Sequence, residues 1–247
     1  MKDLPRYSVC IATFNGGKYI RQQLLTILLQ LDGNCEIIIS DDSSTDNTLA
    51  EIEIIGDPRI RILRNQTFSN PIYNFENCIS HAAGGIIFMS DQDDLWHPHK
   101  VEAMSEVFRN NPDVTLVASD AQIINEKSEL VSDTFYPSRA KFSSGVIQNI
   151  VKNRFLGCTL AFRRSILDVI LPFPPHLPMH DSWIGILNQL YGRVYFVNVP
   201  LILYRRHSQN FTSSTHAGLI QMLIWRLRLV IAILGRIWKC RARKIVV

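Results

Sequence analysis

The first hundred residues alternate between short apolar runs and segments whose apolar side chains repeat with a helical period. Continuous apolar runs that end in turn or polar residues are typical of strands buried on both faces. The expected strands are residues 7–13, 35–40, 59–63 and 86–89, and the expected helices are 18–31, one opening at 45–48, and 71–83. This β-α-β-α order predicts an α/β fold with a parallel, doubly wound sheet.

The second half of the chain alternates less regularly and predicts a mixed sheet within the same domain. We expect strands at residues 114–119, 122–125, 158–162, 193–197 and 201–204, and helices at 145–152 and from about 180 to 190. No internal repeat and no low-complexity segment is present. The pattern therefore predicts one mixed, mostly parallel sheet flanked by helices.

Polar residues follow three of the expected strands at the point where each strand ends. They are Thr13 and Asn15, then Asp41 and Asp42, then the acidic run 91–94. Because ligands of open α/β sheets bind outside the carboxyl ends of the strands, these side chains are candidates for one binding site. Acidic turns also cap helices, so capping remains the alternative for Asp41 and Asp42 and for the acidic run.

The run Asp91-Gln92-Asp93-Asp94 places three carboxylates within four residues. Carboxylates confined at a buried edge repel one another unless a cation neutralises them. Mg²⁺ or Mn²⁺ suits such oxygen ligands. The alternative is a solvated connection in which Asp93 or Asp94 caps a helix that opens near Pro98.

Composition and charge divide the chain into a body, residues 1–216, and a basic tail, residues 217–247. The 247 residues carry a net charge of +4, but the tail holds seven Lys/Arg and no Asp/Glu, against 19 Lys/Arg and 22 Asp/Glu in the body. The N-terminus shows no secretory signal, and the five scattered cysteines form no C-x-x-C pair. These features favour a cytoplasmic protein without a disulfide framework or a structural zinc site.

The tail predicts an amphipathic basic helix, because its apolar and basic residues recur at helical spacing. The apolar face is Leu223, Leu227, Ile231, Leu234 and Trp238, and the basic side is Arg228, Arg236, Lys239 and Arg243. Its uncharged stretches are shorter than the ~20 residues that a membrane span needs. We expect it to lie peripherally on an anionic membrane surface. Docking on the domain is the alternative, and both can hold; nucleic acid is not an expected partner.

The ordered motifs across roughly residues 6–210 resemble the family 2 inverting glycosyltransferases of the GT-A fold. The matching segments are 8–15, 39–46, Asp91 to Asp94 followed by Pro98, Gly157-Cys158, and His180-Asp181. The resemblance implies a GT-A, Rossmann-like sheet and a nucleotide-sugar donor. It assigns Thr13, Asn15, Asp41 and, less firmly, Asp42 to the nucleobase and ribose.

By the same resemblance, Asp91 and Asp93 form the D-x-D signature that places the ribose and a Mn²⁺ or Mg²⁺ on the donor diphosphate. Asp94 is then a second metal ligand or an outer-shell partner, and His207 a metal ligand or a phosphate donor. Arg205 or Arg206, in a segment resembling the Tyr-Arg-x-His ending of bacterial members, could bind the diphosphate. A basic surface loop is the alternative for this segment.

The general base of the family lies in a Glu-Asp motif, which here is matched by His180-Asp181. The resemblance assigns Asp181 to remove the proton of the acceptor hydroxyl, and the Glu-to-His change leaves the role of His180 open. The alternative for Asp181 is an N-cap of the helix that follows.

Together these inferences predict a metal-dependent glycosyltransferase at the inner face of a bacterial cell membrane. It would move a sugar to a polyprenyl-diphosphate-linked saccharide during surface polysaccharide synthesis. UDP-glucose or UDP-galactose is the first expectation for the donor and dTDP-rhamnose the second. The alternatives are a non-catalytic nucleotide-sugar-binding module and a nucleotidyltransferase; the chain has no G-x-G-x-x-G or Walker A loop.

Overall fold

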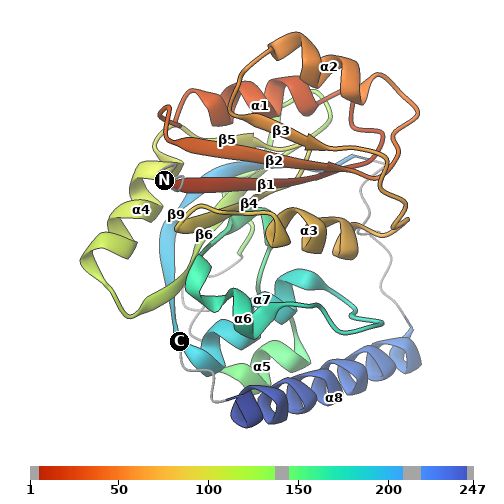
Figure 1. Cartoon of the computed structure of the whole chain (residues 1–247), viewed down its shortest axis with the longest axis vertical. Coiled ribbons are helices and arrows are strands. Elements are labelled where there is room, and N and C mark those ends of the chain that lie inside the picture. Colours follow the sequence, from red (N-terminus) through yellow and green to blue (C-terminus); the bar gives the residue numbers. More distant parts are fainter. Residues whose placement is uncertain (1–5, 137–144, 208–217, 244–247) are drawn as a thin grey trace.

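A computed structural model describes residues 6–136, 145–207 and 218–243 of the chain. Its centre is a nine-stranded sheet with the order β3-β2-β1-β4-β8-β6-β9-β5, and β7 pairs with β6 (Figure 1). The strands are β1 (Tyr7–Thr13), β2 (Cys35–Asp41), β3 (Ile60–Leu63), β4 (Ile86–Ser90), β5 (Leu95–Trp96), β6 (Val114–Ile124), β7 (Leu130–Ser132), β8 (Leu160–Arg163) and β9 (Arg193–Arg205). The α-helices are α1 (Ile20–Leu28), α2 (Thr48–Ile55), α3 (Pro71–Ser80), α4 (Lys100–Asn110), α5 (Val146–Val151), α6 (Leu167–Ile170), α7 (His180–Tyr191) and α8 (Leu219–Arg243).

The first four strands form a parallel unit, as the sequence predicts. β1 pairs in parallel with β2 and with β4, and β2 pairs in parallel with β3. Thr13 lies opposite Asp41 and Ile11 lies opposite Ser90, so the polar ends of β1, β2 and β4 meet at one edge of the sheet. The prediction of a mixed, mostly parallel α/β fold is confirmed.

Two pairs of strands expected in the second half are each one long strand. β6 replaces the strands expected at 114–119 and 122–125, and β9 replaces those expected at 193–197 and 201–204. β6 and β9 run in parallel with register shifts around Asp120, which lies opposite Pro200. A bulge accommodates an unpaired residue and a proline within a continuous ladder, so the polar interruption in the sequence does not end either strand.

The sheet separates two apolar cores, which explains the continuous apolar runs of β1 and β2. On one face α1, α2 and α4 cover side chains that include Val9 and Ile37. On the other face α3, α6, α7 and α8 contribute to a core that includes Cys10 and Ile38. Alternate residues of a strand point to opposite faces, so a strand between two cores needs apolar residues at nearly every position.

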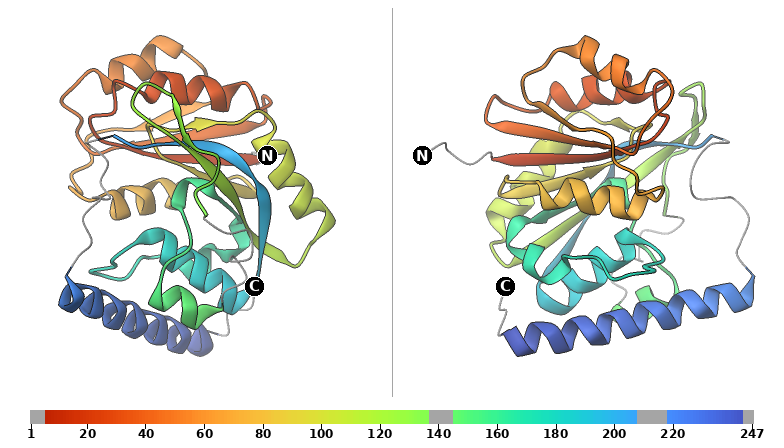
Figure 2. Two further views of the ribbon diagram at one scale, coloured as in Figure 1. Left: turned by 180° about the vertical axis from the view of Figure 1, so that it is seen from behind. Right: turned by 45° about the vertical axis from the view of Figure 1, so that its right-hand side comes forward.

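Helix α8 closes the second core from outside, as the lowest element in both views of Figure 2. Leu229, Ile233 and Cys240 are buried in that core. Arg236, expected on a solvated basic face, is instead buried, and its guanidinium donates to the carbonyls of Val169 and Leu171. These carbonyls lie at the C-terminal end of α6, where helices leave acceptors without partners. The docking expected as an alternative for the tail is therefore present in the described part of α8.

Candidate active site

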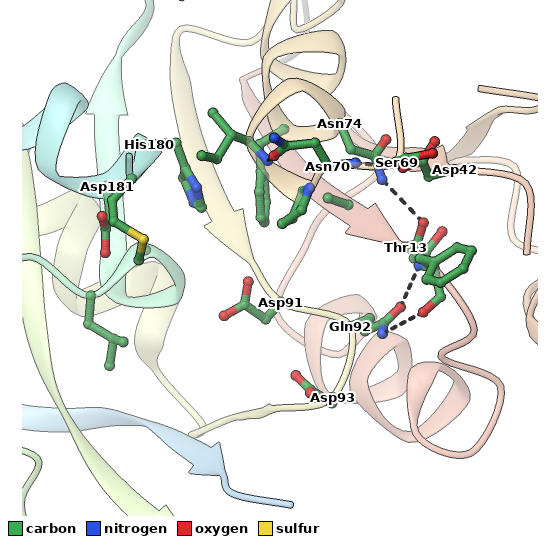
Figure 3. Close-up of a pocket in the computed structure, with 18 of the residues that line it drawn as sticks. Thr13, Asp42, Ser69, Asn70, Asn74, Asp91, Gln92, Asp93, His180 and Asp181 are labelled. Carbon is green, nitrogen blue, oxygen red and sulfur yellow. Dashed lines mark hydrogen bonds between the residues drawn. The ribbon is translucent and has the colours of Figure 1, made fainter. Parts of the chain in front are cut away.

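A cavity of about 530 Å³ lies at the carboxyl edge of the sheet. Its wall is formed by the end of β1, the segment 69–75 at the start of α3, the loop after β4, Gly157, and the start of α7. Thr13 and Asp42 lie on one side, His180 and Asp181 on the opposite side, and Asp91 and Asp93 between them (Figure 3). Five separate segments of the chain thus bring polar side chains to one cavity.

The end of β1 is tied to the end of β2 by side-chain hydrogen bonds. Thr13 Oγ1 donates to Asp41 Oδ1 at 3.0 Å, and Asp41 also accepts from Ser44 N and Oγ at 3.0 and 2.6 Å. Asn15 Oδ1 accepts from Thr45 N at 2.8 Å. Thr13 belongs to the cavity wall, whereas Asp41 and Asn15 are not among the residues that line it and instead shape the loops.

Asp42 is the carboxylate of this pair that reaches the cavity. It is buried, and its oxygens accept from Phe68 N at 2.6 Å and Asn70 N at 3.2 Å. These hydrogen bonds fix the segment that leads into α3, and Asp42 itself forms part of the cavity wall. The sequence ranked Asp41 ahead of Asp42, and the structure places them in the reverse order of access.

Gln92 fastens the acidic loop to the end of β1. Its Oε1 accepts from Phe14 N at 2.9 Å and its Nε2 donates to Phe14 O at 3.1 Å. Both bonds are visible in Figure 3. A pair of bonds to one backbone unit sets both position and orientation, so Gln92 presents its neighbours Asp91 and Asp93 to the cavity.

Asp93 and Asp94 are adjacent but have different partners. Asp93 Oδ2 lies 2.7 Å from His207 Nε2, and both side chains are largely buried. Asp94 is fully buried, and its Oδ1 accepts from Arg205 N at 2.8 Å. Asp94 Oδ2 has no hydrogen-bond partner among the residues described. The structure thus brings Asp93 and His207 together, whereas Asp94 accepts from the backbone of Arg205.

Arg205 is buried behind the acidic loop instead of lining the cavity. Its Nε donates to Asp93 O at 2.7 Å, one Nη donates to Ser128 Oγ at 2.8 Å, and the guanidinium lies 4.7 Å from the Tyr19 ring centre. These contacts hold three loops together. Arg206 is exposed, so it is the arginine of the pair that solvent and a ligand can reach.

Lys100 places a buried amine beneath the acidic loop. Its Nζ donates to Cys158 O at 2.8 Å and lies 4.2 Å from the Trp96 ring centre. Burial lowers the pKa of Lys100 to about 7, although Cys158, Asp94 and Asp91 act in the opposite direction. Burial, together with the nearby Asp93 and Asp181, raises the pKa of Asp91 to about 7. Unlike charges buried together offset part of one another's desolvation.

Asp181 and His180 start α7 and form the far wall of the cavity. Asp181 is 5% exposed, and burial raises its pKa to about 7. Its Oδ1 accepts from Ser182 N at 2.6 Å. The N-cap of α7 is Met179, so Asp181 does not have the capping role considered from the sequence. A buried carboxylate with a raised pKa in a cavity is suited to accept a proton near neutral pH.

His180 packs its ring against Phe75, with the ring centres 4.6 Å apart. Its Nε2 is buried and has no hydrogen-bond partner among the described residues. Burial lowers the pKa of His180 to about 4, so the ring is neutral beside Asp181. A side chain on Gly157 would place its Cβ 3.0 Å from Nε2, which makes glycine the residue that keeps this part of the wall open.

Three residues of the site received no role from the sequence. Asn74 lines the cavity, donates to Thr13 O at 3.2 Å, and leaves its buried Oδ1 without a partner in the described structure. Gln92 and Lys100 support the acidic loop, as described above. Lys100 follows a proline at the start of a helix, where lysines are usually solvated, so its pattern gave no signal.

The acidic loop offers two candidate arrangements for a divalent cation. In the described residues, the ligand atoms of Asp91, Asp94 and Cys158 lie within 4.8 Å of one another. Asp93 and His207 form a second pair beside them. Burial raises the pKa of the Cys158 thiol, and a protonated thiol is a poor ligand for Mg²⁺ or Mn²⁺. The carboxylates and His207 fit such an ion, and the unpartnered Asp94 oxygen adds a further acceptor.

Comparisons with known proteins identify the family of the chain. The family model "Glycosyl transferase family 2" matches residues 8–171. The chain is 27% identical over 211 residues to the E. coli UDP-Glc:alpha-D-GlcNAc-diphosphoundecaprenol beta-1,3-glucosyltransferase WfgD, covering 84% of this chain and 79% of WfgD. It is 27% identical over 223 residues to the Shigella flexneri dTDP-rhamnosyl transferase RfbG, covering 81% of this chain and 72% of RfbG.

The fold is similar to that of S. aureus TarS 1–349, solved in complex with UDP-GlcNAc. The TM-score is 0.71 at 17% sequence identity, and the match covers 93% of this chain and 66% of the TarS chain. At this identity the likeness concerns the fold. It confirms the GT-A type of mixed sheet that the sequence motifs predict.

Proposed function

The chain belongs to glycosyl transferase family 2, and we propose that this glycosyltransferase moves one sugar, with inversion, from a nucleoside-diphosphate donor to a lipid-diphosphate-linked saccharide. One observation carries the proposal. The cavity has a raised-pKa carboxylate, Asp181, on one side and the nucleotide-side residues Thr13 and Asp42 on the other, with Asp91 and Asp93 between them (Figure 3). A direct displacement needs a proton acceptor and a leaving-group site on opposite sides of the sugar carbon.

The nucleotide side of the cavity suits a pyrimidine nucleoside. A carboxylate such as Asp42 can accept the imide N–H of uracil or thymine, and a buried hydrogen bond of this kind discriminates strongly. Asn74 Oδ1 offers a second acceptor on the same wall. The names of WfgD and RfbG include UDP-Glc and dTDP-rhamnosyl, respectively. We propose a UDP-hexose, glucose or galactose, as the first donor and dTDP-rhamnose as the second.

Asp91, Asp93 and His207 are proposed to hold Mn²⁺ or Mg²⁺ together with the donor diphosphate, with Asp94 supporting the loop from behind. A bound divalent ion acts as a Lewis acid that neutralises charge on the departing diphosphate. Gln92 and Arg205 fix the loop backbone, so the carboxylates are positioned before the donor arrives. Arg206, which is exposed at the end of β9, is the proposed arginine contact to the diphosphate.

Asp181 is proposed to accept the proton of the acceptor hydroxyl while that oxygen attacks the anomeric carbon from the face opposite the diphosphate. The C–O bond to the diphosphate breaks as the new glycosidic bond forms, so the anomeric configuration inverts without an enzyme nucleophile. Neutral His180 stands beside Asp181, and its buried Nε2 has no hydrogen-bond partner among the described residues. The acceptor would stay in a membrane through its lipid, and we propose that the reaction takes place at the cytoplasmic surface of that membrane.

The test is transfer by the purified chain to a synthetic GlcNAc-diphosphate-lipid, with a panel of UDP- and dTDP-sugars and Mn²⁺ or Mg²⁺. A mass gain of one hexose or deoxyhexose identifies the donor. EDTA and Asp93→Ala should abolish the gain, and Asp181→Asn should abolish it while donor binding persists. Donor binding without transfer to any acceptor would favour a non-catalytic module. Release of inorganic pyrophosphate in place of sugar transfer would identify a nucleotidyltransferase.

A further inference from the structure

Helix α8 carries a second apolar face that points away from the domain. Its members are at least 60% exposed, and they are Ile220, Leu223, Leu227, Ile231, Leu234 and Trp238, here called the outer stripe. Six residues spaced over five turns of one helix extend about 27 Å. Scattered exposed apolar residues are normal, but a continuous exposed stripe of this size marks an interaction surface.

The outer stripe concentrates exposed apolar side chains to an unusual degree within the described structure. The described structure has nineteen exposed large hydrophobic residues, and eight of them lie in the 25 residues of α8. The opposite side of α8 already packs against the domain core, through Leu229 and Ile233. The outer stripe is therefore additional to the face that docking requires.

The inner face is held by specific contacts, so α8 has a fixed orientation on the domain. Arg236 donates to Val169 O at 2.6 Å, Leu171 O at 2.7 Å and Pro172 O. Arg226 Nε donates to Val151 O at 2.9 Å, at the C-terminal end of α5. Both arginines satisfy carbonyls that end other helices. Rotation of α8 about its axis would break these bonds, so the outer stripe cannot turn inward without cost.

Charge identifies the partner that suits this surface. Residues 218–243 contain six Lys/Arg and no Asp/Glu. With 3.6 residues per turn, Arg228 and Lys239 border the outer stripe on one side and Arg241 borders it on the other. Trp238 within the stripe is of a type that favours the boundary between lipid and water. In the part of the chain that the structure describes, no helix has the length and apolarity to cross a bilayer.

We propose that the outer stripe is a membrane-docking face, which inserts into the headgroup and acyl-chain boundary of a bilayer containing anionic lipid. Amphipathic helices with a basic border bind such interfaces in the membrane plane. This inference rests on α8 alone and does not depend on the reaction proposed above. Protein partners and a second copy of the chain are outcomes that the test separates from lipid.

The docking face gives the cavity a defined orientation toward the membrane. Helices α5, α6 and α7 lie on the α8 side of α3, whereas α1 and α2 lie on the far side of the sheet (Figures 1 and 2). Asp181 opens α7, so it lies on the membrane side of the cavity, and Asp42 follows β2, farther from α8. If the proposed function holds, the lipid-linked acceptor enters from the membrane side and the nucleotide from water.

Vesicle flotation of the full chain tests the docking face directly. Wild-type protein should float with vesicles of phosphatidylcholine and phosphatidylglycerol, and it should float less with phosphatidylcholine alone. Leu227→Glu with Ile231→Glu should lower the bound fraction roughly tenfold or more, because two exposed apolar side chains that would insert into the bilayer become charged. Arg228→Gln with Lys239→Gln should lower binding only to the anionic vesicles, toward the level seen with phosphatidylcholine.

The matched control is Leu29→Glu with Ile54→Glu, which adds the same charge at exposed apolar residues of the α1–α2 side. Both double variants should unfold at the same temperature as wild-type protein, which establishes that folding is unchanged. The proposal is wrong if wild-type protein does not float with anionic vesicles, or if the stripe variant floats as well as the control. A wild-type dimer that the stripe variant converts to a monomer, without lipid binding, would assign the stripe to self-association.

Transfer to a short, lipid-free acceptor separates this proposal from the proposed function. The stripe variant should match wild type with that acceptor and lose rate with a membrane-borne one. Absence of transfer in every variant, with the flotation results as expected, would support the docking face and count against the proposed reaction.

Discussion

The pH dependence of transfer should report the ionisation of Asp181. Burial raises the pKa of this carboxyl to about 7, and only the ionised form can accept the proton of the acceptor hydroxyl. For a pKa of about 7, roughly one tenth of the carboxyl is ionised at pH 6, half at pH 7 and nine tenths at pH 8. We therefore expect kcat/KM to rise about tenfold from pH 6 to pH 8 and then to level off.

Two other titrating groups face Asp181, and the assay can separate them. His180 has its pKa lowered to about 4 by burial, so it stays neutral across this range. Asp91 has its pKa raised to about 7 by burial and by Asp93, but a saturating divalent ion would hold it ionised. Rates should therefore be measured at saturating Mn²⁺ or Mg²⁺ and at subsaturating acceptor.

Asp181→Asn tests the assignment, because it keeps the side-chain shape and removes the base. We expect kcat to fall by about 10² to 10⁴, and the residual rate should lose its rise between pH 6 and pH 8. Asp168→Asn, at an exposed position outside the cavity wall, is the matched control and should retain the wild-type profile. A flat wild-type profile, or a residual rate in Asp181→Asn that still rises tenfold, would refute the assignment of Asp181 as the base.

Three further predictions concern the supporting contacts. Arg236→Met should lower the free energy of unfolding by about 2–4 kcal/mol in urea titrations, since it leaves buried carbonyls unpaired, whereas the exposed Arg228→Met should cost about 0.5 kcal/mol or less. Equal losses would contradict the role of Arg236. Gln92→Ala should weaken donor binding about fivefold or more in calorimetry, because Phe14 loses both hydrogen bonds; unchanged affinity would show that the loop holds without it. His207→Ala should raise the Mn²⁺ concentration for half-maximal activity about tenfold, and no rise would limit His207 to orienting Asp93.

The parallel half of the fold was predictable because each strand there is one uninterrupted apolar run in the sequence. β1, β2 and β4 are apolar runs between two cores, and each ends in polar residues that the parallel pairing then gathers at one edge. β6 and β9 gave incomplete signals. Asp120 and Pro200 interrupt their apolar runs, and whether an interruption is a turn or a bulge depends on the neighbouring strand, which sequence periodicity does not contain.

Within the candidate site, the sequence pointed to loops that line the cavity but could not rank neighbouring side chains. Asp41 and Asp42 are adjacent and chemically identical, yet one is bound by Thr13 and is not part of the cavity wall, and the other lines it. Asp93 likewise lines the cavity, whereas its neighbour Asp94 is bound by the backbone of Arg205 outside the cavity wall. The direction of each side chain depends on backbone angles in loops outside regular strands, where the period of two no longer applies.

The two arginines show that residue type alone does not distinguish a structural role from a ligand-binding role. Arg205 and Arg206 are equivalent in sequence as diphosphate partners, but Arg205 is buried among carbonyl and hydroxyl acceptors of two loops. A guanidinium has five donors in a rigid plane, so it joins several backbone segments as readily as it binds a phosphate. Burial distinguishes the two uses, and burial follows from the packing of β9 against loops more than 70 residues away.

The same reasoning applies to α8, where a helical period revealed one apolar stripe and the structure contains two apolar faces. The outer stripe matches the residues expected from the sequence, and the inner face uses Leu229, Ile233 and the buried Arg236. The helical period of 3.6 residues does not show which face of α8 packs against the domain, because both faces are apolar. The deciding feature is complementarity: Arg236 meets carbonyl acceptors at the end of α6, so that face belongs to the domain. The stripe bordered by exposed cations is consequently the face left for a partner that combines an apolar interior with anionic headgroups.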